Sequence, residues 1–452
     1  MKKIPPPLPD RLAFMSGPRA LIAACYSAAC APHNGGGSLP GGKQGGQTVA
    51  LHLTKTASGL MQSISDAGGR PLVVGGAVRD AFTGHPSKDV DIEAHGITAD
   101  ALHTALLATG HKVDAVGKSF GVLKVTAANG EDFDVSLPRT ESKTTTGHKG
   151  FDIKVDPNLT VEQAFARRDF TINAMGADQA GKLIDPFGGA RDLQSGTLRH
   201  TSDAFAEDPL RVLRGMQFAG RMGLSLHPAT AELARSLKSE RPTIATERIW
   251  TEFEKMASKA TAPSRSLAVL RETGWDEFFP AIAHGDGAAA DRAAKTTKTG
   301  DAKTSLVLAS VLHASHNPSE ALQGIGATLA VSKAVRGYTG LTAPSQATVA
   351  AARTAARTLE KSGLTLRDWI EFKNATSGAD ATASWTKAAT EAGVLDAPAT
   401  KLVTGATLQA RGMRPGPEMG KLLTRATEAT DAGDLTAGTV QSWLDANSPT
   451  NA

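Results

Sequence analysis

The sequence predicts an α+β protein, in which a domain built on a mixed β-sheet precedes a long all-helical region. Short strand-like apolar stretches alternate with helical patterns from about residue 49 to residue 195. Beyond Thr201 the strand patterns vanish and apolar residues recur at helical spacing. A run of mixed elements followed by helices alone is typical of an α+β chain.

Length and composition limit the classes of protein that this chain can belong to. It has 452 residues, enough for several domains that each bury a core. No apolar run is long enough to cross a bilayer, so we expect no membrane partner. The net charge of +4 indicates an anionic partner such as nucleic acid only weakly. Two cysteines, Cys25 and Cys30, exclude a disulfide framework and a cysteine-based zinc site.

The first 47 residues differ from the rest in composition. They are rich in proline and glycine and contain a single acidic residue, Asp10. This composition predicts a disordered leader. A basic segment poor in acids also suits an organelle transit peptide, although its prolines and glycines argue against an amphipathic helix. We therefore expect a cytoplasmic protein, or one in an organelle matrix if residues 1–47 are a transit peptide.

The expected domains are a leader (1–47), a head (48–200), a helical neck (201–280) and a helical body with a tail (281–452). In the head, a helix is expected within residues 51–68, and a second helix from about Val78. The expected strands are Leu72–Val74, Val90–Glu93, Gly121–Val125 and Phe133–Leu137. The expected neck helices are 208–222, 228–237, 246–258 and 264–273. In the body, the polar segment 285–301 is expected to be a loose joint between helices.

Two glycines, Gly75 and Gly76, follow the first buried strand and open a helix. Such a turn lets phosphate groups approach the bare backbone, and the start of a helix adds N–H donors. Many turns have the same two glycines, so this feature alone is weak evidence for a phosphate site.

Acidic residues on the next strands strengthen that interpretation. Asp89 and Asp91 are two apart on a strand, so their side chains project to one face and can share an ion. Carboxylate oxygens beside a phosphate-binding turn suit Mg²⁺. Asp134 lies on another alternating segment; if the two strands are neighbours, three carboxylates converge, as two-metal phosphoryl transfer requires. From spacing alone, a solvated strand face is an equally good interpretation of Asp134.

The segment GGAVRD at Gly75–Asp80, followed by DVD at Asp89–Asp91, resembles the nucleotidyltransferases of the poly(A) polymerase superfamily, and class II tRNA nucleotidyltransferases in particular. Four further segments resemble motifs of that family in the same order, and together they span about residues 72–280. They are RRDFTINA (167–174), DPFGG (185–189) with Asp192-Leu193 and Leu198-Arg199, EDPLRVLR (207–214), and ERI with EFEK (247–255).

The resemblance implies roles for the acids and for the phosphate ligands. Asp89 and Asp91 would hold the magnesium ions, and Asp134 would hold or activate the attacking 3′ hydroxyl. The residues that would contact the incoming triphosphate are Gly76, Arg79 and Arg168. A guanidinium can bind phosphate oxygens through two parallel hydrogen bonds, which supports this role for the arginines. The neighbouring Arg167 is expected at the surface or against the RNA backbone.

Asp208 and Arg211 are expected three apart on a helix, where they would share a face. The carboxylate can accept from an exocyclic amino group while the guanidinium donates to the base. Cytosine and adenine both carry that amino group, so the pair would select CTP and ATP without a template. A lone pair of this kind is otherwise an ordinary surface salt bridge. One turn later, Arg214 is expected to meet phosphate or ribose.

The resemblance implies template-independent addition of CCA to the 3′ end of tRNA from CTP and ATP, with Mg²⁺ as cofactor and release of pyrophosphate. A poly(A) polymerase, or an enzyme that adds only CC or only A, shares the head motifs and remains an alternative. A non-catalytic RNA-binding protein on the same fold is another alternative, and the intact acids argue against it. The sequence does not specify an oligomeric state.

Three further segments are of interest. The polar loop 143–150 is expected to be either a mobile element of the family or a solvated linker. Residues 403–421 resemble the tail of bacterial members of the family. Between residues 281 and 340, where many bacterial relatives have a His-Asp phosphohydrolase domain, the sequence has only His313 and His316, with no His-Asp pair. We therefore expect no hydrolase activity, and histidines at this spacing are usually structural or exposed.

Overall fold

The computed structural model describes residues 47–85, 87, 89–114, 121–143, 151–344, 346–377 and 382–447. The leader expected over residues 1–47 therefore lies outside the described residues, apart from Gln47. Residues Thr48–Ala452 form one compact unit.

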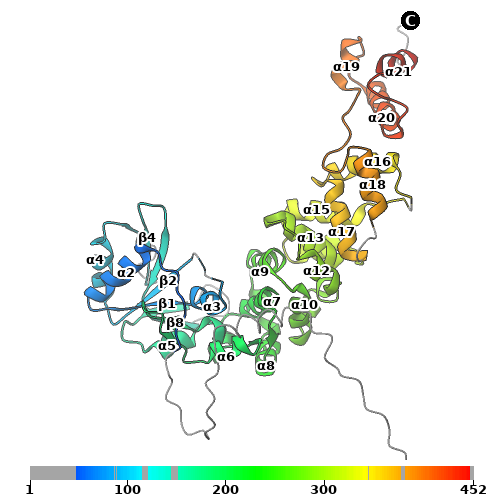
Figure 1. The fold of residues 1–452 in the computed structure, drawn as a ribbon. Coiled ribbons are helices and arrows are strands. Elements are labelled where there is room, and N and C mark those ends of the chain that lie inside the picture. Colours follow the sequence, from blue (N-terminus) through cyan, green and yellow to red (C-terminus); the bar gives the residue numbers. More distant parts are fainter. Residues whose placement is uncertain are drawn as a thin grey trace, which may run out of the picture. The chain divides into compact units, whose positions relative to one another are not determined.

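A mixed sheet forms the head, as predicted, and it has seven strands among the described residues (Figure 1). The parallel pairing of β2 with β5 and the antiparallel pairing of the other neighbours make the sheet mixed. Its strands, in spatial order, are β3 (Lys112–Asp114), β4 (Val122–Thr126), β5 (Asp132–Ser136), β2 (Asp91–His95), β1 (Arg70–Val74), β8 (Gly176–Ala177) and β9 (Leu183–Ile184).

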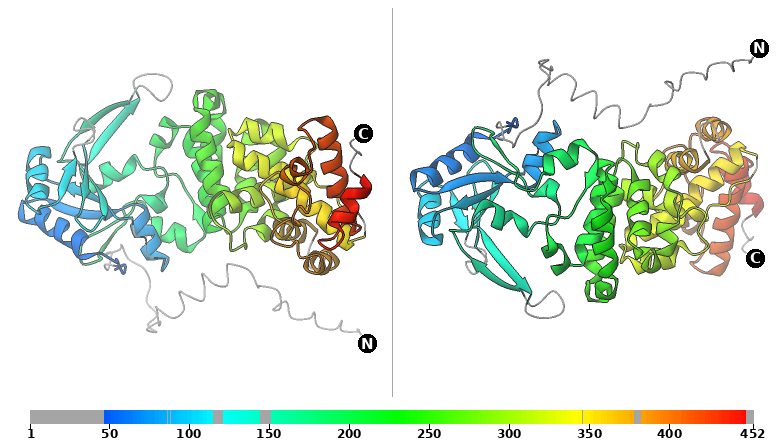
Figure 2. Two further views of the ribbon diagram at one scale, coloured as in Figure 1. Left: turned by 90° about the horizontal axis from the view of Figure 1, so that it is seen from above. Right: turned by 90° about the horizontal axis from the view of Figure 1, so that it is seen from below.

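Two helices, α2 (Lys55–Asp66) and α4 (Ala99–Leu107), lie side by side next to this sheet (Figure 2). The hydroxyl of Ser63 donates to the carbonyl oxygen of Ala105 at 2.7 Å and joins the two helices. Thr54 caps the start of α2 by accepting a hydrogen bond from a backbone N–H of its first turn. The shorter helix α3 (Gly76–Phe82) follows β1 directly.

Short elements connect the sheet to the helical region. The strands β6 (Arg139–Lys143) and β7 (Phe151–Val155) pair separately from the main sheet. The loop expected at 143–150 lies between them, outside the described residues except for Lys143. The elements that follow are α5 (Val161–Ala166), the 3-10 helix η2 (Thr171–Asn173), α6 (Gly189–Gln194), β10 (Thr197–Leu198) and the 3-10 helix η3 (Asp203–Glu207).

The neck is helical, as predicted, with one small departure. The two-residue strand β11 (Ser225–Leu226) pairs in parallel with β10, so strand pairing does extend beyond Thr201. Helix α7 packs against α9 and α10. The four neck helices are α7 (Leu210–Met222), α8 (Pro228–Ser236), α9 (Thr246–Lys259) and α10 (Pro263–Glu272).

The body consists of further packed helices, and its first part corrects an expectation. Residues 285–301 are not only a loose joint, because they contain α12 (Gly287–Ala293), which buries Ala289, Ala290 and Ala293. A single apolar core runs without interruption from Val49 in the head to Val394 in the body. The other body helices are α11 (Pro280–Ala283), α13 (Gly300–Leu312), α14 (Pro318–Gly324), α15 (Leu329–Gly340), α16 (Val349–Glu360), α17 (Leu366–Ser377) and α18 (Ala383–Glu391).

The tail has a small apolar core of its own. It contains α19 (Gly405–Ala410), α20 (Pro417–Ala432) and α21 (Val440–Asn447). Arg357 of α16 binds Asp431 of α20, with its Nη2 2.6 Å from Oδ1, and this ion pair joins the body to the tail. The buried side chains of the tail core are Val403, Leu408, Met419, Leu422, Ala426, Leu435 and Leu444. Among the described residues, no helix has the length and apolar character needed to span a membrane.

Candidate active site

The turn between β1 and α3 needs glycine at Gly75. This residue has φ of +70°, a backbone conformation that strains any residue with a side chain. A Cβ at this position would also lie 3.0 Å from Nη1 of Arg168. Gly76, which the sequence singled out, is the first residue of α3, and a Cβ there would lie 3.5 Å from Nη2 of Arg79, an ordinary contact. The close approach of an arginine to the turn therefore depends on Gly75.

The three predicted carboxylates lie on neighbouring strands. Asp91 begins β2, and Asp89 precedes it by two residues. The parallel register pairs Ile92 with Val135. The preceding residues of the two strands, Asp91 of β2 and Asp134 of β5, therefore lie beside each other. All three side chains reach solvent. The pairing of β2 with β5, which the sequence left open, therefore places Asp91 next to Asp134.

The electrostatics of Asp91 show that these carboxylates repel one another. The surrounding protein displaces part of the water around Asp91, and this burial raises its pKa; the carboxylates of Asp134 and Asp89 raise it further. The nearby Arg168 lowers it only in part. Among the described residues, none of the three acids forms an ion pair. Hard oxygen donors with unbalanced negative charge suit a divalent cation such as Mg²⁺. No group of three possible ligands is already arranged around one point among the described residues.

Arg79, expected at the triphosphate, is held inside the protein. Its side chain is almost fully buried, and burial lowers its pKa. It donates from Nη1 to Oδ1 of Asn173 at 2.6 Å and from Nε to Oδ1 of Asp80 at 2.8 Å. Its guanidinium also lies 5.2 Å from the centre of the Phe218 ring, which belongs to α7. Arg79 thus joins the head to the neck, whatever else it binds.

Arg168 lies close to the acids and the glycine turn. It donates from Nη1 to the carbonyl oxygen of Asn173 at 3.4 Å and from Nη2 to Oε2 of Glu93 at 3.3 Å. Glu93 is fully buried, and its Oε1 lies 3.0 Å from Nε2 of His95. Burial alone would raise the pKa of Glu93, but the hydrogen bond with His95 and the positive charge of Arg168 outweigh it, so the pKa is lowered. Glu93 is therefore a buried, ionised carboxylate that binds an arginine.

Arg214 is paired with a second buried acid. Its Nε donates to Oδ2 of Asp169 at 2.7 Å, and Asp169 also accepts from Nδ2 of Asn173 at 2.9 Å. Burial would raise the pKa of Asp169, but Arg214 and the hydrogen bonds outweigh it and lower the pKa. The guanidinium of Arg214 lies 5.6 Å from the centre of the Phe218 ring, so Phe218 contacts both Arg79 and Arg214. Contact of Arg214 with phosphate or ribose stays a prediction.

The structure corrects the expected placement of Asp208 and Arg211. Asp208 precedes α7 in an extended conformation, with φ of −128° and ψ of 103°, because a residue before proline avoids the helical region. The two residues therefore do not share a helix face, and each has other partners. Oδ2 of Asp208 accepts from Nη2 of Arg248 at 2.7 Å. Arg211 donates to the carbonyl oxygens of Ala204 at 2.6 Å and Arg167 at 2.7 Å.

Residues 72–199 match the family described as poly A polymerase head domain. Residues 223–285 match a second family, described as the probable RNA and SrmB binding site of polymerase A. The carboxylates, the glycine turn and Arg168 all lie within the head domain, whereas Asp208 and Arg211 lie between the two matched segments.

Two curated relatives are similar to part of this chain. The Multifunctional CCA protein of Aromatoleum aromaticum is 45% identical over 206 residues, which are 45% of this chain and 48% of the relative. The Multifunctional CCA protein of Neisseria gonorrhoeae is 43% identical over 204 residues, 45% of this chain and 47% of the relative. The chain spans about half the length of the curated relatives it matches.

Solved structures share the fold over most of the chain. The CCA-adding enzyme of Bacillus stearothermophilus in complex with CTP has a TM-score of 0.65 and 22% identity, and covers 87% of this chain and 98% of its own. The Thermotoga maritima CCA-adding enzyme complexed with tRNA has a TM-score of 0.59 and 20% identity. The match covers 86% of this chain and 93% of the enzyme. The head domain and the helical region that follows it therefore have the same fold as these enzymes.

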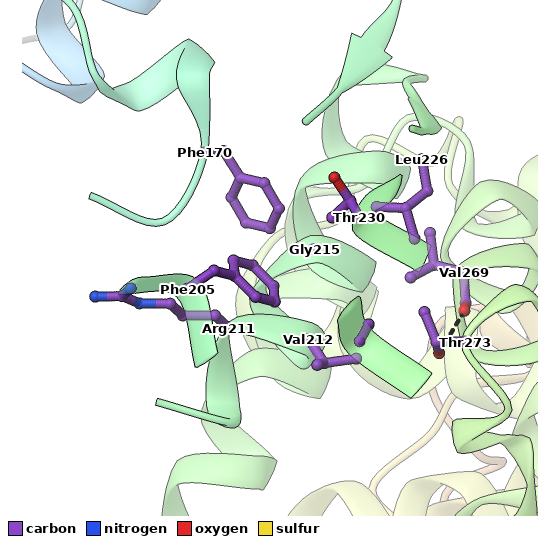
Figure 3. A pocket seen from close by; sticks show the side chains of 10 residues that line it. Phe170, Phe205, Arg211, Val212, Gly215, Leu226, Thr230, Val269 and Thr273 are labelled. Atoms are coloured by element: carbon purple, nitrogen blue, oxygen red, sulfur yellow. Dashed lines mark hydrogen bonds between the residues drawn. The ribbon is translucent and has the colours of Figure 1, made fainter. Parts of the chain in front are cut away.

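An apolar contact joins the head domain to α7 next to Arg211. The rings of Phe170 and Phe205 meet edge to face with their centres 5.5 Å apart, and Figure 3 shows them together near Gly215. A Cβ at Gly215 would lie 3.1 Å from Phe170, so the close packing requires a small residue there. The guanidinium of Arg211 extends away from this apolar pocket (Figure 3). The pocket is a packing contact that supports the site, and the three carboxylates are not among the residues that line it.

Several residues that hold the site together were not predicted from the sequence. They are Asp80, Glu93, Asp169, Asn173 and Phe218. The alternation Asp91, Glu93, His95 marks Glu93 as sharing a strand face with Asp91, and that signal was available. In the body, Nε2 of His313 lies 3.0 Å from Oδ2 of Asp286, and Asp286 caps the start of α12, so His313 takes part in a structural contact.

Proposed function

We propose that this chain adds CMP, CMP and AMP in turn to the 3′ end of tRNA, using CTP and ATP and releasing pyrophosphate. The observation that supports this most directly is the placement of Asp91 beside Asp134, with Asp89 nearby, next to Arg168 and the glycine turn. The similarity to Multifunctional CCA proteins favours tRNA over other RNA acceptors.

In this proposal Asp89 and Asp91 hold Mg²⁺, which would stabilise negative charge on the transferring phosphate. Asp134 orients the attacking 3′ hydroxyl and accepts a hydrogen bond from it. Arg168 binds phosphate oxygens and stabilises charge that develops as pyrophosphate leaves. Transfer then depends on positioning and charge stabilisation more than on a strong base.

Selection of the base would take place at Asp208 and Arg211. Asp208 has a carboxylate that can accept from the amino group of cytosine or adenine. Its Oδ2 is bound by Arg248 in this structure, so an incoming base would share that carboxylate with Arg248 or displace it. The two carbonyl contacts of Arg211 fix the direction of its guanidinium.

The test uses a tRNA that ends at its discriminator base, with labelled CTP and ATP and with Mg²⁺ present or chelated. We expect exactly three added nucleotides, ending in A, and no incorporation with chelator. Substitution of Asp89, Asp91 or Asp134 by Asn should abolish the signal. Asp114→Asn is a matched control, because Asp114 lies on the edge strand β3 of the same sheet and pairs with Lys112.

The other outcomes identify the alternatives. Long adenylate tails would show a poly(A) polymerase, and a product that stops after C addition, or that needs a preformed CC end, would show an enzyme of narrower specificity. RNA binding without any incorporation would show a non-catalytic protein and would contradict the proposal.

A further inference from the structure

Glu93 is an unusual carboxylate in this head domain. It is two residues from Asp91 on β2, so both side chains leave the strand on the same face. Asp91 reaches solvent, whereas Glu93 is fully buried. Both of its oxygens are bound within the protein, Oε1 by Nε2 of His95 at 3.0 Å and Oε2 by Nη2 of Arg168 at 3.3 Å. Nη2 of Arg167 lies farther from the same Oε2, at 3.9 Å.

The position of Arg168 depends on Glu93 more than on its other contacts. The hydrogen bond from Nη1 to the Asn173 carbonyl, at 3.4 Å, is about as long as the one from Nη2 to Glu93, at 3.3 Å, but only the latter joins two opposite charges. The Phe165 ring, whose centre is 5.0 Å from the guanidinium, limits movement on one side but does not fix a direction. A hydrogen bond between two charged groups is stronger than either contact. Nε of Arg168 has no partner among the described residues.

We propose that Glu93 is a positioning residue for nucleotide binding, which holds the Arg168 guanidinium against the glycine turn so that it faces the triphosphate of CTP or ATP. This rests on the proposed function, in which Arg168 binds phosphate. Glu93 does not bind the metal ion, although its spacing from Asp91 would suit a third ligand, because both of its oxygens are turned to protein donors. His95 supports Glu93 from the other side.

The experiment measures the dissociation constant of CTP for the full chain by calorimetry, in the presence of Mg²⁺ and without tRNA. A second titration measures the Mg²⁺ concentration at which CTP binding is half-maximal. Glu93→Gln keeps the shape of the side chain but removes its charge. We expect CTP binding to weaken about tenfold, the loss typical of one charge-assisted hydrogen bond. The Mg²⁺ requirement and the affinity for tRNA should not change.

Two further variants separate positioning from general damage. Asp431→Asn is the matched control, because it removes a buried carboxylate of the tail that binds an arginine, Arg357 of the body. It should leave CTP affinity unchanged. Arg168→Lys should weaken CTP binding by itself, and in the double variant with Glu93→Gln the two losses should not add, since Glu93 acts through Arg168.

A raised Mg²⁺ requirement in Glu93→Gln would show that Glu93 is a metal ligand and would overturn the proposal. Additive losses in the double variant, or unchanged CTP affinity, would overturn it as well. If Glu93→Gln fails to fold, the test uses Glu93→Asp, which keeps the negative charge but moves it away from Arg168. Unchanged CTP affinity in Glu93→Asp would then contradict the proposal. Because CTP binding is measured without tRNA, the result does not depend on whether the chain adds CCA.

Discussion

The head domain contains two groups of acidic residues in contrasting surroundings. Asp89 and Asp91 near the start of β2 and Asp134 in the middle of β5 reach solvent, and among the described residues they form no ion pair. Glu93 and Asp169 are buried, and each is bound by an arginine. The first group accumulates negative charge that an added cation would neutralise. The second group has its charge neutralised by the protein itself.

The contrast shows that a carboxylate near a catalytic site can serve either chemistry or structure. Burial without a partner raises the pKa of a carboxylate, whereas burial with an arginine partner lowers it. Asp91 follows the first pattern and Asp169 the second. Partners and solvent exposure therefore distinguish the two groups, although both lie within residues 72–199, the segment that matches the poly A polymerase head domain.

The largest expected effect separates Asp91 from Asp169. We expect Asp91→Ala to lower the rate of incorporation by at least about a thousandfold with little change in melting temperature. Asp169→Ala should instead lower the free energy of unfolding by about 3 kcal/mol, because it leaves Arg214 without its partner. Single-turnover kinetics and thermal melts measure both. A loss of only about tenfold in Asp91→Ala would reject its assignment to the metal site.

A second prediction concerns the base-selecting residues, where function and structure overlap. Asp208→Ala should reduce discrimination against UTP and GTP by about 1–3 kcal/mol, more than it reduces turnover with CTP. Arg211→Ala should be harsher, since it also removes the hydrogen bonds to the Ala204 and Arg167 carbonyls. The measurement is relative kcat/KM for the four triphosphates. Unchanged selectivity in both variants would place base selection elsewhere in the molecule.

A third prediction tests the contact between the head and the neck. Phe218→Leu keeps an apolar side chain but loses the aromatic face that meets Arg79 and Arg214. We expect a loss of about 1–2 kcal/mol in stability and a higher KM for CTP and ATP. Phe372→Leu is the control, because Phe372 is also buried but packs against the ring of Tyr338. An equal effect of both variants on KM would show that the Phe218 contact is only packing.

The smallest expected effect is a difference in pH dependence without metal. The raised pKa of Asp91 means that the stability linked to this group is present at low pH and is lost as pH rises through its folded pKa. Asp91→Asn should therefore melt slightly above the wild type at neutral pH with chelator, and the difference should vanish in acid. Added Mg²⁺ should reduce the difference by stabilising the wild type.

Asp169 should show the opposite sign. Its pKa is lowered, so its stabilisation is present above its ordinary value of 3.8 and is lost as pH falls through the folded pKa. Asp169→Asn should melt below the wild type at neutral pH, with the gap closing in acid. If the melting-temperature difference from the wild type changed with pH in the same direction for Asp91→Asn and Asp169→Asn, the two groups of acids would not differ as we propose.

The sequence predicted most of the head and neck elements to within a few residues. Apolar runs bounded by glycine located β1, and alternation located β2 and β5. Alternation shows which face a side chain occupies but not which strand lies next to it, so the proximity of Asp134 to Asp91 required the structure. Two-residue strands such as β8 and β11 are too short to leave a periodic pattern.

Other features were missed for specific physical reasons. The spacing of Asp208 and Arg211 predicts a shared helix, but the following Pro209 keeps the backbone of Asp208 extended. Helix α12 was missed because an alanine-rich segment shows little contrast between apolar and polar positions. The partners of Arg79 and Arg168 are far away in sequence, and motif spacing does not reveal which acids will be buried with them.

The separate core of the tail has a consequence for local unfolding. The head, neck and body share one continuous apolar core, so their central amide protons should exchange with solvent mainly when the whole unit unfolds. The tail core has seven buried side chains among the described residues, and it can open while the larger core stays intact. Amides of α20 and α21 should therefore exchange faster than those of α7 or α13, and a protease should cleave first near residue 400.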